Sequence, residues 1–129
     1  MEGKNVFSTG LANVYVEEGI LYISMILTEP TIADYRQHFV ALKAHYGAIF
    51  PLLAILSNPE HAKQPNKEMR DYMAGREMSE IVSALGIIND SSVMRLMANL
   101  FFKISRPAYP MQMFGDVEKA KTWLRSLSK

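Results

Sequence analysis

The sequence contains no cysteine, which excludes disulfide frameworks, thiolate metal sites and cysteine nucleophiles. Its apolar stretches are far shorter than the roughly 20 residues that a membrane helix needs. Residues 1–10 are polar and lack the apolar centre of a signal peptide. No charge sign dominates, since 14 basic and 13 acidic residues leave a net charge of +1, without the basic surface typical of nucleic-acid binders. We therefore expect a cytoplasmic protein that neither spans a membrane nor binds nucleic acid.

The sequence also lacks the common catalytic motifs. There is no glycine-rich phosphate loop, no G-x-S-x-G turn, no H-E-x-x-H pair and no convincing pair of acids. His38 and His45 are seven residues apart in a predicted helix, which places them about 10 Å apart along its axis, too far for one metal ion. Their polar neighbours predict a solvated face for both. We expect no enzyme, no metal and no cofactor.

The chain of 129 residues, 49% of them hydrophobic, fits one globular domain. We predict a flexible N-terminus over residues 1–10 and a single domain over residues 11–129. Two β-rich runs joined by Glu17-Glu18-Gly19 predict a hairpin. A stripe from Ile32 to Tyr46 predicts a helix capped by Thr31 and ended by Gly47 as its C′ residue.

The remaining pattern alternates strands and helices. Short, wholly apolar runs predict interior parallel strands, and cap residues mark the helices between them. The predicted elements are strands at 51–56, 84–88 and 111–114, a helix after Asn66, a helix over Val93–Ile104 and a last helix after Asp116. The order β-β-α-β-α-β-α-β-α predicts a mixed sheet with right-handed crossovers.

The second half of the chain carries a recognisable series of motifs. They are RDYMA at 70–74, ALGIINDS at 84–91, LFFKISRP at 100–107, PMQMF at 110–114 and EKAKTWL at 118–124. In order and spacing, the chain over roughly residues 12–127 resembles the SpoIIAA-like, STAS/SEC14-type small domains of bacteria. The resemblance implies an α/β fold with a mixed sheet opened by a β-hairpin and helices packed mainly on one side.

The same resemblance implies binding functions. Better-known relatives are anti-sigma factor antagonists, which bind a partner kinase and are switched by serine phosphorylation; others resemble Sec14-type lipid carriers. Ser57 lies near the position of the phosphorylated serine, but its surroundings, Ile55-Leu56-Ser57-Asn58-Pro59, lack the antagonists' Asp-x-Ser pattern.

Polar side chains follow two predicted neighbouring strands. Ser57 and Asn58 follow the first, and Asp90, Ser91 and Ser92 follow the second. Ligands of open α/β sheets gather at such strand ends, so these residues form a possible crevice. The alternative is that Asp90 or Ser91 only caps the following helix, and Asp90 would repel an anion.

The predicted helix over Val93–Ile104 has more apolar residues than one buried stripe requires. A second subunit, an apolar ligand or another layer of the same chain would have to cover the surplus. The residues that we assign to this interface or apolar ligand site are Met94, Met97, Leu100, Phe101 and Phe102.

The sequence thus favours a non-enzymatic, STAS-like binding or regulatory domain that recognises a regulatory protein partner and forms a homodimer. An alternative is a carrier or sensor of a small nonpolar, lipid-like molecule held under the same helix. A third possibility is an enzyme acting at the strand ends near Ser57 and Ser91.

Overall fold

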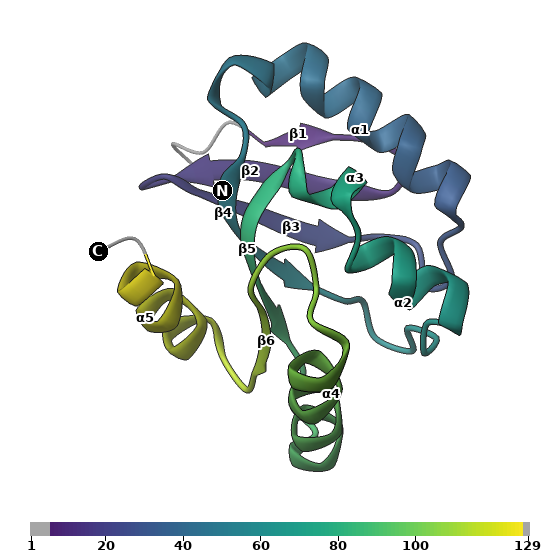
Figure 1. Ribbon diagram of the computed structural model, residues 1–129. Coiled ribbons are helices and arrows are strands. Elements are labelled where there is room, and N and C mark those ends of the chain that lie inside the picture. The colour runs from purple at the N-terminus through teal and green to yellow at the C-terminus, as the bar shows by residue number, and fades with distance from the viewer. Residues whose placement is uncertain (1–5, 128–129) are drawn as a thin grey trace.

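The computed structural model describes residues 6–127 and contains one six-stranded mixed sheet, whose strands lie in the order of the chain (Figure 1). The strands are β1 (Phe7–Ser8), β2 (Ala12–Glu17), β3 (Ile20–Met25), β4 (Leu52–Ser57), β5 (Val82–Ile88) and β6 (Met111–Phe114). The first three pair antiparallel, and β3 to β6 pair parallel. The predicted mixed sheet with an opening hairpin is confirmed.

The helices lie on both faces and at one edge of this sheet. They are α1 (Ile32–Tyr46), the 3-10 turn η1 (Gly47–Ile49), α2 (Lys67–Met73), α3 (Arg76–Ser79), α4 (Ser92–Ser105) and α5 (Val117–Leu127). Every crossover from β3 to β6 moves one strand in the same direction, so right-handed connections place α1, α2 and α3 on one side of the sheet, and α4, in the last crossover, packs its Phe102 toward the same side at the β6 edge. Accordingly, α1, α2 and α3 cover one face, whereas α5, which follows the last strand, packs on the other (Figure 1).

Two apolar clusters hold these layers together. The larger one joins the sheet to α1 through Tyr35, Phe39 and Leu42, and the smaller one lies under Ala120 and Leu124 of α5. A Cβ atom on Gly86 would lie 3.1 Å from that of Ala120. The glycine in β5 therefore allows α5 to approach the sheet closely.

Local sequence signals explain where the elements start and turn. Glu18 and Gly19 both have positive φ angles, 54° and 79°, as a two-residue hairpin turn requires. Thr31 and Asp34 form a capping box at the start of α1, with bonds of 2.8 and 3.1 Å between each backbone N–H and the opposite side chain. The hairpin and the start of α1 thus follow from short-range chemistry.

Three features differ from the sequence prediction. Phe7–Ser8 form β1, although no element is predicted in residues 1–10; residues 1–5 lie outside the described part. Gly47 ends α1 as predicted, but it is right-handed (φ −46°) and also begins η1, which was not predicted. The four-residue α3 is an addition between α2 and β5.

Candidate functional site

Helix α4 lies along the sheet edge formed by β6, at the lower end of the molecule in Figure 1. Ser91 caps its first turn, since the Ser91 hydroxyl accepts the N–H of Met94 at 3.2 Å. Arg106, with a left-handed φ of 50°, ends it. No residue of α4 is fully buried, because the helix lies at the edge of the sheet (Figure 1) and only part of its surface contacts the core.

The inner face of α4 is attached by Phe102, which packs against the larger core cluster, and by two polar side chains. Asn99 accepts the N–H of Met113 at 2.7 Å and donates to the carbonyl of the same residue at 3.2 Å. These are backbone groups of β6 that a seventh strand would otherwise pair. Arg95 donates to the Asn89 carbonyl at 2.9 Å.

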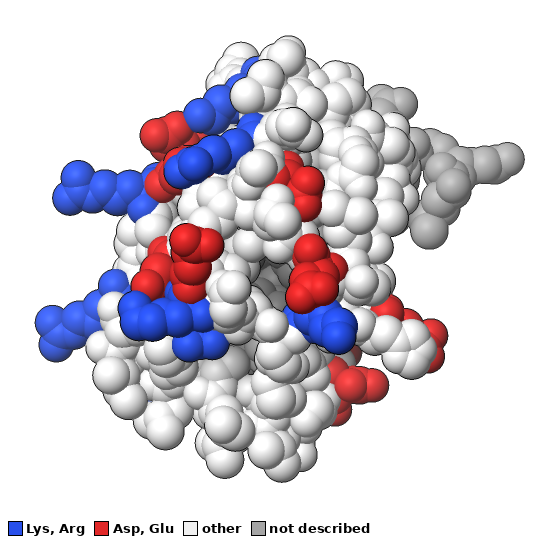
Figure 2. All heavy atoms as spheres, turned by 90° about the vertical axis from the view of Figure 1, so that its right-hand side faces the viewer, with Lys and Arg blue, Asp and Glu red and all other residues white. Residues whose placement is uncertain are grey.

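The outer face of α4 is apolar and exposed to solvent. Its six side chains are between 36 and 73% exposed: Val93, Leu96, Met97, Leu100, Phe101 and Ile104. Figure 2 shows that the lowest part of the visible surface, at the level of α4 in Figure 1, carries no Lys, Arg, Asp or Glu. The helix therefore turns a mixed polar and apolar side to its own domain and leaves a second, continuous apolar stripe in water, where a helix of a globular domain usually carries polar residues.

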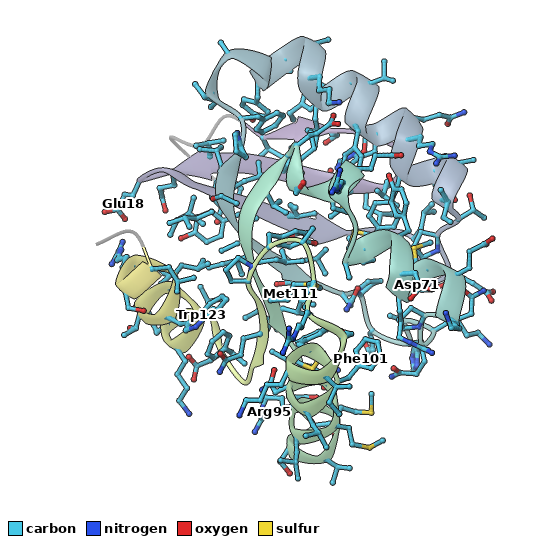
Figure 3. The ribbon with its side chains drawn as sticks, viewed as in Figure 1. Glu18, Asp71, Arg95, Phe101, Met111 and Trp123 are labelled. Carbon is cyan, nitrogen blue, oxygen red and sulfur yellow. The ribbon has the colours of Figure 1, made fainter. Side chains whose placement is uncertain are left out.

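The position of this outer face is fixed by contacts around the helix. Phe101 lies on the side facing α2 (Figure 3), where the Arg70 guanidinium is 5.7 Å from its ring centroid. In the loop after α4, the Ala108 N–H donates to the Ala74 carbonyl at 2.8 Å, and the Tyr109 hydroxyl donates to the Met73 carbonyl. Burial raises the pKa of that Tyr109 hydroxyl, which keeps it a donor. The C-terminal end of α4 is thus tied to α2.

The residues that the sequence assigns to this surface separate into two groups. Met97, Leu100 and Phe101 lie on the outer face, whereas Met94 and Phe102 are half-buried, with Phe102 packed against the larger core cluster. Val93, Leu96 and Ile104 complete the outer face but are absent from the assigned set. The four-residue spacing of Arg95 and Asn99 is the signal that could have identified the inner face.

The predicted strand-end crevice is only partly assembled. Ser57 pairs in register with Ile88, so the two strand ends are neighbours. Ser57 lines a hollow of about 190 Å³ together with Tyr15, Tyr22 and Val117, on the α5 side of the sheet. Asn58, Asp90, Ser91 and Ser92 are not among the residues lining it, and Ser91 serves as the α4 cap.

A second hollow, of about 390 Å³, lies between α1 and the segment around β1. Thr9 and His38 line it, and the Thr9 hydroxyl oxygen is 2.7 Å from Nδ1 of His38. The solvated face predicted for both helix histidines is wrong for His38, which is 3% exposed and whose pKa burial lowers to about 4. His45 is exposed and stacks on Phe7 at 4.3 Å.

Within residues 6–127, no three His, Asp or Glu side chains come together in a group that could hold a metal ion. Over the same residues, none of the helices combines the length and the apolar character that crossing a bilayer requires.

Comparison with known proteins gives a family and a fold. A family profile described as "Domain of unknown function (DUF7793)" matches residues 14–128. The crystal structure of an uncharacterised DUF3478-family protein with a SpoIIAA-like fold, from Shewanella loihica PV-4, is similar over 95% of this chain and 92% of that one. Its TM-score is 0.54 and the sequence identity 14%, so the likeness shows the fold alone. No curated protein matches the sequence. The SpoIIAA-like fold expected from the motifs is confirmed.

Proposed function

This chain belongs to the DUF7793 family, whose description assigns no function, and we propose from its own surface that it is a non-enzymatic, STAS-like binding domain. It recognises a protein partner through the outer face of α4. The observation that carries this proposal is the apolar outer face of α4, where six large side chains are exposed while Arg95 and Asn99 fix the opposite side of the helix to the domain.

The exposure of this face has a free-energy cost that binding would remove. Burying a side chain such as leucine stabilises a complex by about 1.5–3 kcal/mol relative to leaving it in water. Contiguous apolar surface on one helix is typical of protein interaction sites, whereas single exposed apolar residues are not. The contacts of Asn99 and Tyr109 hold the helix in place before a partner arrives, which lowers the entropy lost on binding.

A protein fits this surface better than a small nonpolar molecule. Small ligands are bound in concave sites that enclose most of their surface. The α4 side chains project outward, and the two hollows described above are lined by residues of other elements. The carrier alternative therefore has less support than protein recognition.

The proposal is tested by the size of the complexes that the chain forms in the cells that make it. We expect the epitope-tagged protein to elute from a size-exclusion column above its 14.6 kDa monomer mass. The double variant Leu96→Ser/Leu100→Ser should elute as the monomer, because it removes the centre of the outer face.

A matched control is available on α1. Val40 is 73% exposed, the same fraction as Leu96, and Val40→Ser should leave the elution volume unchanged. A wild-type protein that elutes as a monomer, or a double variant that keeps the large complex, would contradict the proposal.

A further inference from the structure

We infer that the partner of the α4 outer face is a second copy of the same chain, with the two α4 helices packed antiparallel about a two-fold axis. This inference rests on the proposed function and names the occupant of the same surface.

The first argument is the position of the exposed side chains. Their spacing of three and four residues is the one by which helices pack side by side. The set is also symmetric about the midpoint between residues 98 and 99. Reversing the helix about that midpoint exchanges Val93 with Ile104, Leu96 with Phe101 and Met97 with Leu100. In an antiparallel pair, each exposed apolar residue therefore faces another member of the set.

The second argument is charge. Asp90 precedes the α4 cap, Arg106 follows the last turn, both are exposed, and neither forms an ion pair within residues 6–127. An antiparallel pair brings Asp90 of one copy to Arg106 of the other at both ends of the interface, and it opposes the two helix dipoles favourably. In a parallel pair, the two Asp90 side chains would lie beside each other, and so would the two Arg106 side chains. Helix α4 contains no acidic residue that could pair with Arg106 at its C-terminal end. Asp90 of the second copy supplies that negative charge.

The size of the surface sets the expected strength. A helix of 14 residues is about 21 Å long. One such helix per copy gives an interface at the small end of the range for specific complexes. We expect a reversible dimer with a dissociation constant on the order of micromolar.

The absence of cysteine allows a direct test of the orientation. Val93→Cys and Ile104→Cys each place one thiol at one end of the outer face. In the antiparallel pair, residue 93 of one copy faces residue 104 of the other, while identical positions are separated by 11 residues, or about 16 Å. A disulfide needs Cα atoms roughly 4.4–6.8 Å apart. An equimolar mixture of the two purified variants should therefore form a disulfide-linked dimer under mild oxidation, many times faster than either variant alone.

Val40→Cys, on the exposed side of α1, measures collisional cross-linking. Circular dichroism checks that each variant folds, and sedimentation velocity of the unmodified protein gives its oligomeric state. Rapid cross-linking of each variant by itself would overturn the antiparallel arrangement and leave the proposed function standing. A purified protein that sediments as a monomer at all concentrations and cross-links no faster than Val40→Cys would overturn the second copy as partner. If its complex in cell extracts still depends on Leu96 and Leu100, the protein-binding proposal would survive that result.

Discussion

His38 is a buried, neutral imidazole held by one hydroxyl group. The Thr9 hydroxyl accepts the N–H groups of Leu11 and Ala12, each at 3.2 Å. Because it already accepts twice, its own proton is left for one of two acceptors, the Ala12 carbonyl at 3.2 Å or Nδ1 of His38 at 2.7 Å, and we assign it to the shorter contact with His38. A protonated imidazole could not accept that bond. Burial and this bond therefore both favour the neutral form, in agreement with a pKa lowered to about 4.

Acid should consequently destabilise the fold through His38. The folded pKa of about 4 lies below the ordinary histidine pKa of 6.5, so the unfolded chain binds more protons between these pH values. The stabilisation is complete above pH 6.5 and is lost as the pH falls to about 4, up to about 3 kcal/mol. We expect His38→Gln to remove this part of the pH dependence in urea unfolding.

The quantity to compare is the difference in unfolding free energy between wild type and His38→Gln at each pH, because the carboxylates contribute equally to both proteins. His45→Gln, at the exposed histidine of the same helix, is the control and should leave the profile unchanged. Parallel profiles for wild type and His38→Gln would show that His38 does not titrate in this range.

At the scale of elements, most boundaries could be predicted, but the environment of each helix face could not. The Asn66 and Asp116 caps and the Met111–Phe114 strand follow from local chemistry and period. The burial of His38 could not be foreseen, because β1 and Thr9, which cover that face of α1, have no sequence signal of their own. The two-residue β1 pairs with β2 close by in the sequence, but the contact between Thr9 and His38, which buries the imidazole, joins segments far apart in the chain.

The orientation of α4 about its own axis also could not be predicted from the sequence. Apolar residues occupy most of its circumference, so the sequence predicted a surplus without showing which side faces outward. That side depends on β6 being the last strand, whose free Met113 backbone groups pair with Asn99. Which residues form the outer face is thus a property of the sheet edge as much as of the helix.

The Asn99 contact can be tested through the β6 backbone. Asn99→Ala removes the hydrogen-bond partners of one N–H and one carbonyl of Met113, which lowers the free energy of unfolding by about 1–2 kcal/mol. The better helix propensity of alanine raises it by roughly half a kcal/mol. We expect a net loss of about 1 kcal/mol in urea unfolding and faster hydrogen exchange at the Met113 amide. Asn58→Ala, an exposed asparagine in a loop, is the control and should change neither quantity. Unchanged exchange at Met113 would mean that the side chain does not protect this edge.

For the whole molecule, the core and the proposed binding surface are separate. The larger cluster lies between the sheet and α1–α3, and the smaller one lies under α5, whereas Leu96 and Leu100 point away from both. Surface substitutions distant from the core usually change stability by less than about 0.5 kcal/mol. The outer face of α4 should therefore be removable without loss of the fold.

This separation predicts a concentration effect on thermal unfolding. Association of folded chains raises the melting temperature as protein concentration increases. We expect such a rise for the wild type and for Val40→Ser, and a constant value for Leu96→Ser/Leu100→Ser that equals the dilute wild-type value. If the melting temperature rises equally with concentration for all three proteins, any association does not use the outer face of α4.

The two ends of the sheet also limit how far association can proceed. Asn99 occupies the outward backbone groups of β6 at Met113, and β1, at the opposite edge, spans Phe7–Ser8 in the described part of the chain. Among residues 6–127, neither edge offers a long row of free groups onto which further chains could add as strands. A dimer formed through one α4 helix per copy, in contrast, buries the outer face of both helices, so that a third chain finds no free α4 face. Assembly of this protein should therefore be self-limiting in stoichiometry, and filaments should appear only when α4 detaches from β6.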